Sequence, residues 1–248
     1  APVQAQVNAE ALRPDPLGAG WSRSVEGSLA LATGNVDVLD VGGAARVQLQ
    51  TVRPGPVPFL RQRGLVAVSA RYAARADAAY VDQAFAHARW TAMWWPRVGS
   101  DVFAQYQHNQ FLRLRGRAIA GVGVRAELVH RAALLVWAGS GYMFEHDRIA
   151  VAPGAADPPT SAEHRSTSYL TARLALAEGR LLVQHTAYAQ PRLDAPADVR
   201  VLDELEVLAR VTTVFAFGAT LGVLYDSAPP TAVESTDVRL LSTVRATF

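Results

Sequence analysis

Apolar and polar residues alternate along most of this chain, and the alternation is clearest near its end. Every second residue from Phe215 to Tyr225 is apolar, and small or polar residues lie between them. After a loop with two prolines the alternation resumes and runs to Phe248. A period of two is typical of β-strands, because successive side chains on a strand point to opposite faces. The sequence therefore predicts a long antiparallel hairpin over about residues 213–248.

The same alternation begins at Gly20 and predicts about twelve strands in a single domain, 20–248, preceded by a periplasmic segment, 1–19. An even number of strands would put both termini on the same, periplasmic, side. All 14 prolines fall outside the strand interiors, as expected because proline removes a donor of the strand ladder. The expected strands cover about 21–32, 36–51, 60–74, 80–95, 100–114, 117–130, 132–149, 164–177, 181–190, 199–212, 215–226 and 238–248.

The two faces of these strands differ in chemistry. One face is rich in alanine and valine, and the other carries many arginines. No apolar run approaches the roughly 18–20 residues of a membrane helix. The pattern predicts an all-β protein, an antiparallel transmembrane β-barrel with its apolar face toward lipid. The alternative is a water-soluble β-sandwich or lipocalin-like barrel, which would turn its apolar face inward.

Aromatic residues gather near the ends of the expected strands, which favours the membrane barrel. Two girdles of aromatic side chains usually mark the two interfaces of a membrane. The aromatic residues expected at these interfaces are Trp21, Tyr72, Trp90, Trp94, Trp95, Phe215, Phe217, Tyr225 and Phe248.

The composition of the chain limits its possible cellular compartments and binding partners. There is no cysteine, and the formal net charge of +2 gives no sign of a nucleic-acid-binding protein. The first residues lack the features of a signal peptide, so the barrel interpretation requires that one has been removed. We expect a bacterial outer-membrane location, with membrane lipid and lipopolysaccharide as surroundings. We also expect the last strand to be recognised by the barrel-assembly machinery.

Two segments resemble a known family. The segment Gly20-Trp-Ser, followed by Thr33-Gly-Asn-Val-Asp37, is similar to the opening of the YdiY-like "salt-induced outer membrane protein" family. The end of the chain, Leu224-Tyr-Asp-Ser-Ala-Pro-Pro230 with its final strand, is similar to the last hairpin of that family. The resemblance covers the chain from about Val7 onward. It implies an outer-membrane barrel and no catalytic residues.

The polar face predicts the lining of a lumen. Charges that line a low-dielectric passage would make a narrow channel for small polar solutes or ions, with a mild preference for anions. Alternatively, arginines paired with carboxylates would fill the barrel and leave a non-conducting structural or accessory protein. The expected lining residues are Glu26, Asp40, Arg46, Arg89, Arg125, Glu127, Arg173, Glu204, Glu206, Arg210, Arg239 and Arg245.

Metal binding and catalysis receive weaker support from the sequence. His146 and His164, with the acidic residues beside them, flank the longest expected loop, but no histidine spacing matches a metal site. We therefore expect no metal and no cofactor. His185 and Ser242 both belong to the outward set, yet no hydrolase motif surrounds them, so we expect no enzyme.

One arginine cluster is a candidate for lipopolysaccharide. Arg113, Arg115 and Arg117 would hold its phosphates if they shared a hairpin tip. Ordinary arginines at the edge of a barrel are the alternative.

Overall fold

The computed structural model describes residues 19–32, 38–52, 61–75, 78–110, 112–151 and 153–246. Twelve β-strands occupy most of this chain. They are β1 (Gly20–Ala32), β2 (Val38–Val52), β3 (Arg61–Arg75), β4 (Ala78–Met93), β5 (Val98–Asn109), β6 (Leu114–His130), β7 (Leu134–Ile149), β8 (Thr160–Leu176), β9 (Leu181–Pro191), β10 (Val199–Arg210), β11 (Phe215–Asp226) and β12 (Thr236–Ala246).

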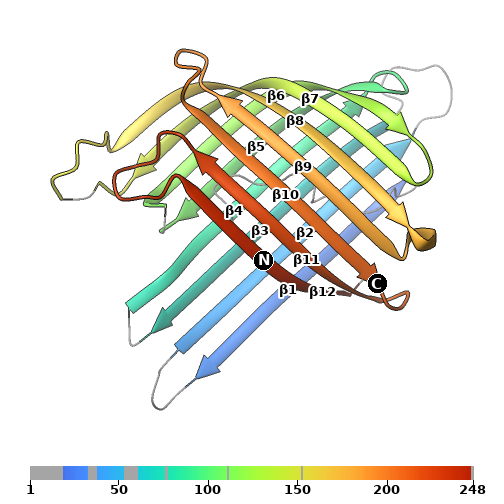
Figure 1. Ribbon diagram of the computed structural model, residues 1–248, viewed down its shortest axis with the longest axis horizontal. Helices are drawn as coiled ribbons and strands as arrows, with labels where there is room; N and C mark the ends of the chain where they lie inside the picture. The colour runs from blue at the N-terminus through green and yellow to red at the C-terminus, as the bar shows by residue number, and fades with distance from the viewer. Residues whose placement is uncertain are drawn as a thin grey trace.

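Each strand pairs with the next strand in sequence, so the sheet has the simple order β1 to β12 and every described pairing is antiparallel. The sheet curls on itself, and the later strands β9 to β12 cross in front of the earlier strands β1 to β4 (Figure 1). The predicted all-β, twelve-stranded antiparallel barrel fold is confirmed. Closure between β1 and β12 and the periplasmic position of the termini stay predictions.

Most strand ends lie within two residues of the expected positions, and the larger differences are at the end of β5 and at the starts of β6 and β8. The fourth strand ends at Met93 rather than at Trp95, because the backbone N–H groups of Trp94 and Trp95 both donate to the carbonyl of Val98 and form a turn. The fifth strand ends at Asn109 rather than at residue 114. The turn that follows requires Arg113 in the left-handed region, with φ of 54°.

Burial along the strands alternates with the polarity of the sequence, but in the opposite sense to a soluble protein. In β6, Val122 and Val124 are exposed, whereas Arg117 and Arg125 are buried. The same holds around the sheet: the exposed residues include many large apolar side chains, and the buried ones include five arginines. A polar interior and an apolar outer surface are the arrangement of a transmembrane β-barrel and exclude the soluble alternative.

The connections differ between the two ends of the sheet. We call the end with segments 110–113, 150–159, 192–198 and 227–235 the long-loop end, and the opposite end, with 94–97, 131–133, 177–180 and 211–214, the short-turn end. A single turn of 3₁₀ helix at Ala177–Gly179 is the only helical element in the described chain. None of the described helical residues forms a helix long and apolar enough to cross a membrane.

Candidate functional site

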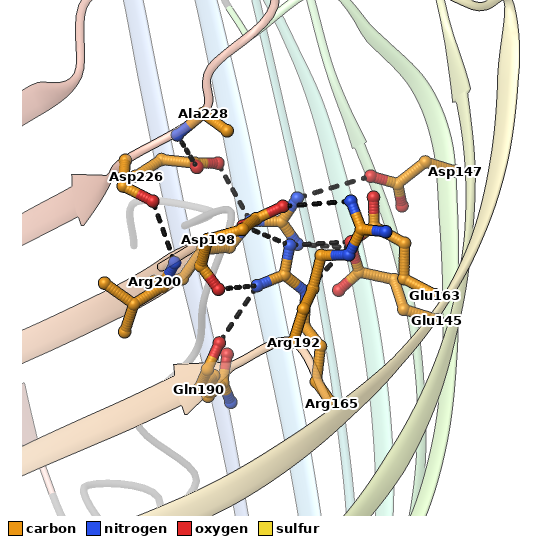
Figure 2. Close-up of polar contacts among 12 residues, drawn as sticks. Glu145, Asp147, Glu163, Arg165, Gln190, Arg192, Asp198, Arg200, Asp226 and Ala228 are labelled. Atoms are coloured by element: carbon orange, nitrogen blue, oxygen red, sulfur yellow. Dashed lines mark hydrogen bonds and ion pairs between the residues drawn. The ribbon is translucent and has the colours of Figure 1, made fainter. Parts of the chain in front are cut away.

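The strongest cluster of charges lies inside the curled sheet, near the long-loop end. Arg117 of β6 donates two parallel hydrogen bonds to Asp147 of β7, with Nε–Oδ1 and Nη2–Oδ2 distances of 2.8 and 2.6 Å. Arg200 of β10 contacts Glu145 of β7 through Nη1, and it donates from Nε to Asp226 of β11 at 2.8 Å. Because β7 and β10 are not neighbours, the Arg200–Glu145 contact crosses the interior (Figure 2).

A second cluster continues the first toward the loops. Arg165 of β8 donates to Glu163 at 2.6 Å and to Asp198 at 2.9 Å, and its Nη1 reaches the carbonyl of Gln190 at 2.9 Å. Asp198 also accepts a hydrogen bond from Arg192 at 3.2 Å (Figure 2). Only 1% of the Arg165 side chain is exposed, so its charge depends on these acceptors.

The two clusters lie side by side (Figure 2), and we call them together the ion-pair network. It consists of Arg117, Glu145, Asp147, Glu163, Arg165, Arg192, Asp198, Arg200 and Asp226. Its members come from five strands and one loop, and Glu145 is 1% exposed. Buried charges require such pairing, because an unpaired ion in a low-dielectric interior costs several kcal/mol.

Loops from distant parts of the chain meet above this network. Arg113 donates to the carbonyls of Thr231 and Ala150, and it forms an ion pair with Asp157 at 3.6 Å. Asp157 in turn accepts hydrogen bonds from the backbone and hydroxyl of Thr231. The β5–β6, β7–β8 and β11–β12 connections are therefore tied together, and we call these contacts the loop strap.

A cavity of about 170 Å³ lies between the loop strap and the ion-pair network. Its loop side is apolar and includes Leu112, Pro230 and Val233, whereas Arg117 and Arg200 contribute to its polar side. A cavity of this volume holds a few water molecules, since one water occupies about 30 Å³ of liquid.

Two aromatic rings on the concave side of the sheet lie against glycines of neighbouring strands. A Cβ atom added to Gly139 would come within 2.3 Å of Cε1 of Tyr169, and one added to Gly121 within 2.3 Å of Cζ of Phe103. Tyr169 of β8 crosses to β5, where its hydroxyl donates to Asp101 at 3.3 Å. We call these two ring-on-glycine contacts the aromatic belt.

Polar groups accompany the aromatic belt. Asp101 also accepts a hydrogen bond from Thr91, and it lies 3.8 Å from a guanidinium nitrogen of Arg125. The guanidinium of Arg125 lies 5.9 Å from the centre of the Trp137 ring, and that of Arg89 stacks similarly on an aromatic ring. Cations over aromatic faces are stabilised by the quadrupole of the ring.

The short-turn end has a smaller bridge of its own. Arg61 of β3 donates to Glu127 of β6 at 2.8 Å and to the carbonyl of Pro96 at 3.0 Å. His130 also contacts the Glu127 carboxylate, at 3.1 Å. Since β4 and β5 lie between β3 and β6, this bridge also crosses the concave side of the sheet.

One ion pair lies in a loop in contact with water. Arg192 donates two hydrogen bonds to Asp194, at 3.0 and 2.7 Å. These hydrogen bonds hold the pKa of the Asp194 carboxyl below its ordinary value and raise the pKa of Arg192. The pair therefore stays charged throughout the neutral pH range.

The structure places the expected lumen residues as follows. Arg89, Arg125 and Glu204 are buried on the concave side, and Arg210 is exposed at a strand end. The half-buried residues are Arg46, Glu127, Arg173, Glu206 and Arg239. The side chains of Glu26, Asp40 and Arg245 lie outside the described part of the chain.

All the expected interface aromatics that the structure describes are exposed, and Phe248 lies outside the described residues. Trp21, Trp94 and Phe215 are near the short-turn end, whereas Tyr72 and Tyr225 are near the long-loop end. Their contact with a membrane interface stays a prediction.

The arginines 113, 115 and 117 do not share a hairpin tip, contrary to one sequence hypothesis. Arg117 is buried in the ion-pair network, Arg113 belongs to the loop strap, and Arg115 is exposed on the outer face. Two residues apart on a regular strand, Arg115 and Arg117 would share a face, but a register shift between Leu114 and Gly116 breaks the alternation here.

The sequence reasoning missed most of the ion-pair network. It grouped Glu145, Asp147 and Glu163 with His146 and His164 in a solvated loop, but the carboxylates face the interior and both histidines are exposed. The alternation does predict their inward position, because Glu145 and Asp147 are an even number of residues from the inward Trp137 and so lie on the same face of the strand. In the described residues, no group of three or more potential metal ligands is arranged around a common site.

The outward histidine and serine singled out above also lie apart. His185 is on β9 and Ser242 on β12, and these strands are not neighbours in the sheet. His185 instead contacts Asp203 of β10.

Comparisons with known proteins identify a family. Its model, described as "Protein of unknown function, DUF481", matches residues 58–248, and the family includes YdiY-like proteins. No match is found among curated proteins. The resemblance noted in the sequence is therefore confirmed for the larger part of the chain.

Two solved structures are similar in fold. The NanC porin in a rhombohedral crystal form is 6% identical, with a TM-score of 0.49, over 92% of this chain and 99% of that one. The beta domain of the Bordetella autotransporter BrkA is 12% identical, with a TM-score of 0.43, over 93% and 100%. Identities and scores this low carry no functional conclusion. The family match alone decides the assignment, and the chain belongs to the DUF481 family of proteins of unknown function.

Proposed function

We propose that this chain spans a bacterial outer membrane as a β-barrel whose polar lumen is closed at rest. On this proposal it acts as a structural or accessory barrel rather than as an open pore. The single observation that carries the proposal is the ion-pair network, in which Arg200 contacts Glu145 across the interior.

The outer surface supports the membrane location. The exposed faces of the strands carry valine, leucine and aromatic side chains, such as Val124 and Leu170, which would be costly in water. In lipid these side chains are favourable, and the strand ladders satisfy the backbone groups that hydrocarbon cannot solvate. An apolar outer band of this kind is a constant property of outer-membrane barrels.

Burial of the inward charges supports a closed lumen. In a wide water-filled pore, inward charges would be exposed to solvent. Here Arg117, Arg165 and Glu145 are each less than 9% exposed, and contacts between non-neighbouring strands occur at both ends and in the middle. The buried charges consist of five arginines and four carboxylates, so they give little reason to expect a preference for anions.

A narrow channel for small polar solutes or ions is the second candidate. It is favoured by the polar character of the concave side along its length and by the cavity of about 170 Å³ beneath the loop strap. In such a channel the ion-pair network would be the barrier, and its separation would open the path.

Current through single molecules in a planar bilayer separates the two candidates. We expect refolded full-length protein to produce no steady conductance steps, and the double variant Glu145→Ala/Arg200→Ala to produce them, because it removes the contact that crosses the lumen. Glu234→Ala, at an exposed loop residue, is the matched control and should remain silent. Insertion is checked by heat-modifiable electrophoretic mobility. Steady steps from correctly inserted wild-type protein would refute the closed lumen and support the channel.

A further inference from the structure

An ionisable pair lies on the outer face of the sheet, where apolar side chains dominate. Nε2 of His185, on β9, lies 2.9 and 3.0 Å from the two carboxylate oxygens of Asp203, on β10. The two side chains are 48% and 46% exposed. This outward pair takes no part in the ion-pair network, which occupies the opposite face of the same strands.

The register places the outward pair within the apolar band rather than at its edge. Asp203 lies opposite Val223 of β11, which is between Phe217 and Tyr225 near the two ends of that strand. Along the strand direction, His185 lies two residues further from the level of Tyr225 than Asp203 does. The outward pair therefore lies between the two sets of exposed aromatic side chains.

Several other outward ionisable residues of the described chain lie nearer to the strand ends. Arg115 and Arg148, for example, lie next to the ends of β6 and β7 and beside the loops. At those places a charged side chain reaches water easily.

Direct contact with lipid hydrocarbon would be unfavourable for the outward pair. A charged side chain on the lipid face of a barrel costs most near the middle of the membrane, and an ionisable residue in that region usually marks a functional contact. Contact with another protein surface lowers this cost, because polar groups there gain hydrogen-bond partners.

The surroundings of the outward pair allow a close protein contact. Ala187 lies opposite Asp203 in the register, and Ala172 lies opposite His185. Small side chains at these positions let a second backbone approach, which favours association in membranes, where hydrophobic burial alone gives no driving force.

The charges of the outward pair are self-complementary. Asp203 is an acceptor only, so Nε2 of His185 donates to it, and within the described residues Nδ1 has no hydrogen-bond partner. In a two-fold dimer the same patch meets itself. In the doubly protonated form of His185, the Nδ1–H group would donate to the carboxylate of the other copy, so that positive and negative groups alternate around the axis.

We propose that the outer face of β8 to β10 binds a second copy of this chain within the membrane, with His185 and Asp203 at the centre of the interface. This inference rests on the proposed membrane location. It assigns to the outward pair a role that is independent of whether the lumen is open or closed.

Disulfide crosslinking in lipid vesicles tests the interface, and the absence of cysteine from the natural chain makes it specific. The variant Ala187→Cys places a thiol beside the outward pair. Ala120→Cys places one on an exposed alanine of β6, away from this face, as the matched control. Both full-length proteins are refolded into phosphatidylcholine vesicles at low protein-to-lipid ratio and treated with a mild oxidant.

We expect the crosslinked dimer of Ala187→Cys to exceed that of Ala120→Cys about tenfold, a ratio typical of polar contacts between membrane segments. Adding His185→Val and Asp203→Val to Ala187→Cys should reduce its yield to the control level while insertion is retained. Equal yields from the two thiols, or a yield that the double replacement leaves unchanged, would overturn the interface. Failure to insert into vesicles at all would instead refute the membrane location.

Discussion

The ion-pair network and the aromatic belt both occupy the lumen, but they fill it by different physical means. The network uses opposite charges from strands that are far apart, as in the contact between Arg200 and Glu145. The belt uses shape, because the ring of Tyr169 lies where a side chain at position 139 would otherwise be. A contact between charges is lost when one charge is removed, whereas a ring packed on a glycine of the neighbouring strand stays in place until the backbone itself moves.

This difference has a consequence for where a path could open. Removal of a charge from the network leaves its partners unpaired in a low-dielectric site, which favours water entry. Removal of the Tyr169 ring leaves a gap beside Gly139 and takes one hydrogen-bond donor from Asp101, which keeps the hydrogen bond from Thr91. On the closed-lumen proposal, the network is therefore the barrier to ions, and the belt supports the shape of the barrel.

The largest effect is expected when the carboxylate of Glu145 is removed from the ion-pair network. Glu145→Ala removes the carboxylate that contacts both Arg117 and Arg200 and leaves Asp147 as the acceptor they still share. We expect the free energy of unfolding to fall by about 3–5 kcal/mol, the usual cost of breaking a buried ion pair. Urea unfolding of vesicle-inserted protein measures it. Glu234→Ala, which removes an exposed carboxylate, should change the midpoint little. Equal effects of the two replacements would show that the network contributes no particular stability.

A smaller effect is expected in the aromatic belt. Gly139→Ala places a methyl group against the Tyr169 ring and should lower the free energy of unfolding by about 1–3 kcal/mol, as overpacking usually does. Gly64→Ala in β3 is the matched control, because a Cβ there meets no atom within 4 Å.

A double-mutant cycle sharpens this second prediction. Tyr169→Ala removes the ring, so the cost of Gly139→Ala should largely disappear in that background. If Gly139→Ala costs the same with and without the ring, the belt is not a steric contact, and the contrast with the network fails.

The smallest effect is expected at Asp194, a loop carboxylate outside the ion-pair network that pairs with its member Arg192. The lowered pKa of Asp194 means that its contribution to stability is present above the ordinary carboxyl value of about 4 and is lost as the pH falls through the lower folded value. The pair is screened by water, so Asp194→Asn should leave the urea midpoint at pH 7 almost unchanged. A large fall in the urea midpoint would mean that ion pairs in loops stabilise the protein as much as ion pairs in the lumen do.

The sequence was sufficient to predict the fold, because alternation and proline positions carry it directly. The strand over 181–190, for example, was expected almost as β9 forms it. The turns were less predictable, since the left-handed conformation of Arg113 has no strong sequence signal.

The candidate site was predictable only in part. The alternation predicts that Arg125 and Glu204 point inward, and both are buried. Their partners do not follow, because a contact such as that of Arg61 with Glu127 depends on the curvature of the sheet and not on spacing within one strand. Likewise, the approach of Tyr169 to Gly139 requires the register between β7 and β8.

The ion-pair network also has a consequence for the order in which contacts form while the barrel assembles. Each strand pairs with its neighbour in sequence, so hairpins form through local contacts and need little loop closure. Glu145 arrives with β7, but Arg200 reaches it only when β8, β9 and β10 are in place. Until then the interior holds a carboxylate that lacks this arginine and that favours water around it. On the closed-lumen proposal, the contact that closes the lumen therefore forms only after β10 has docked.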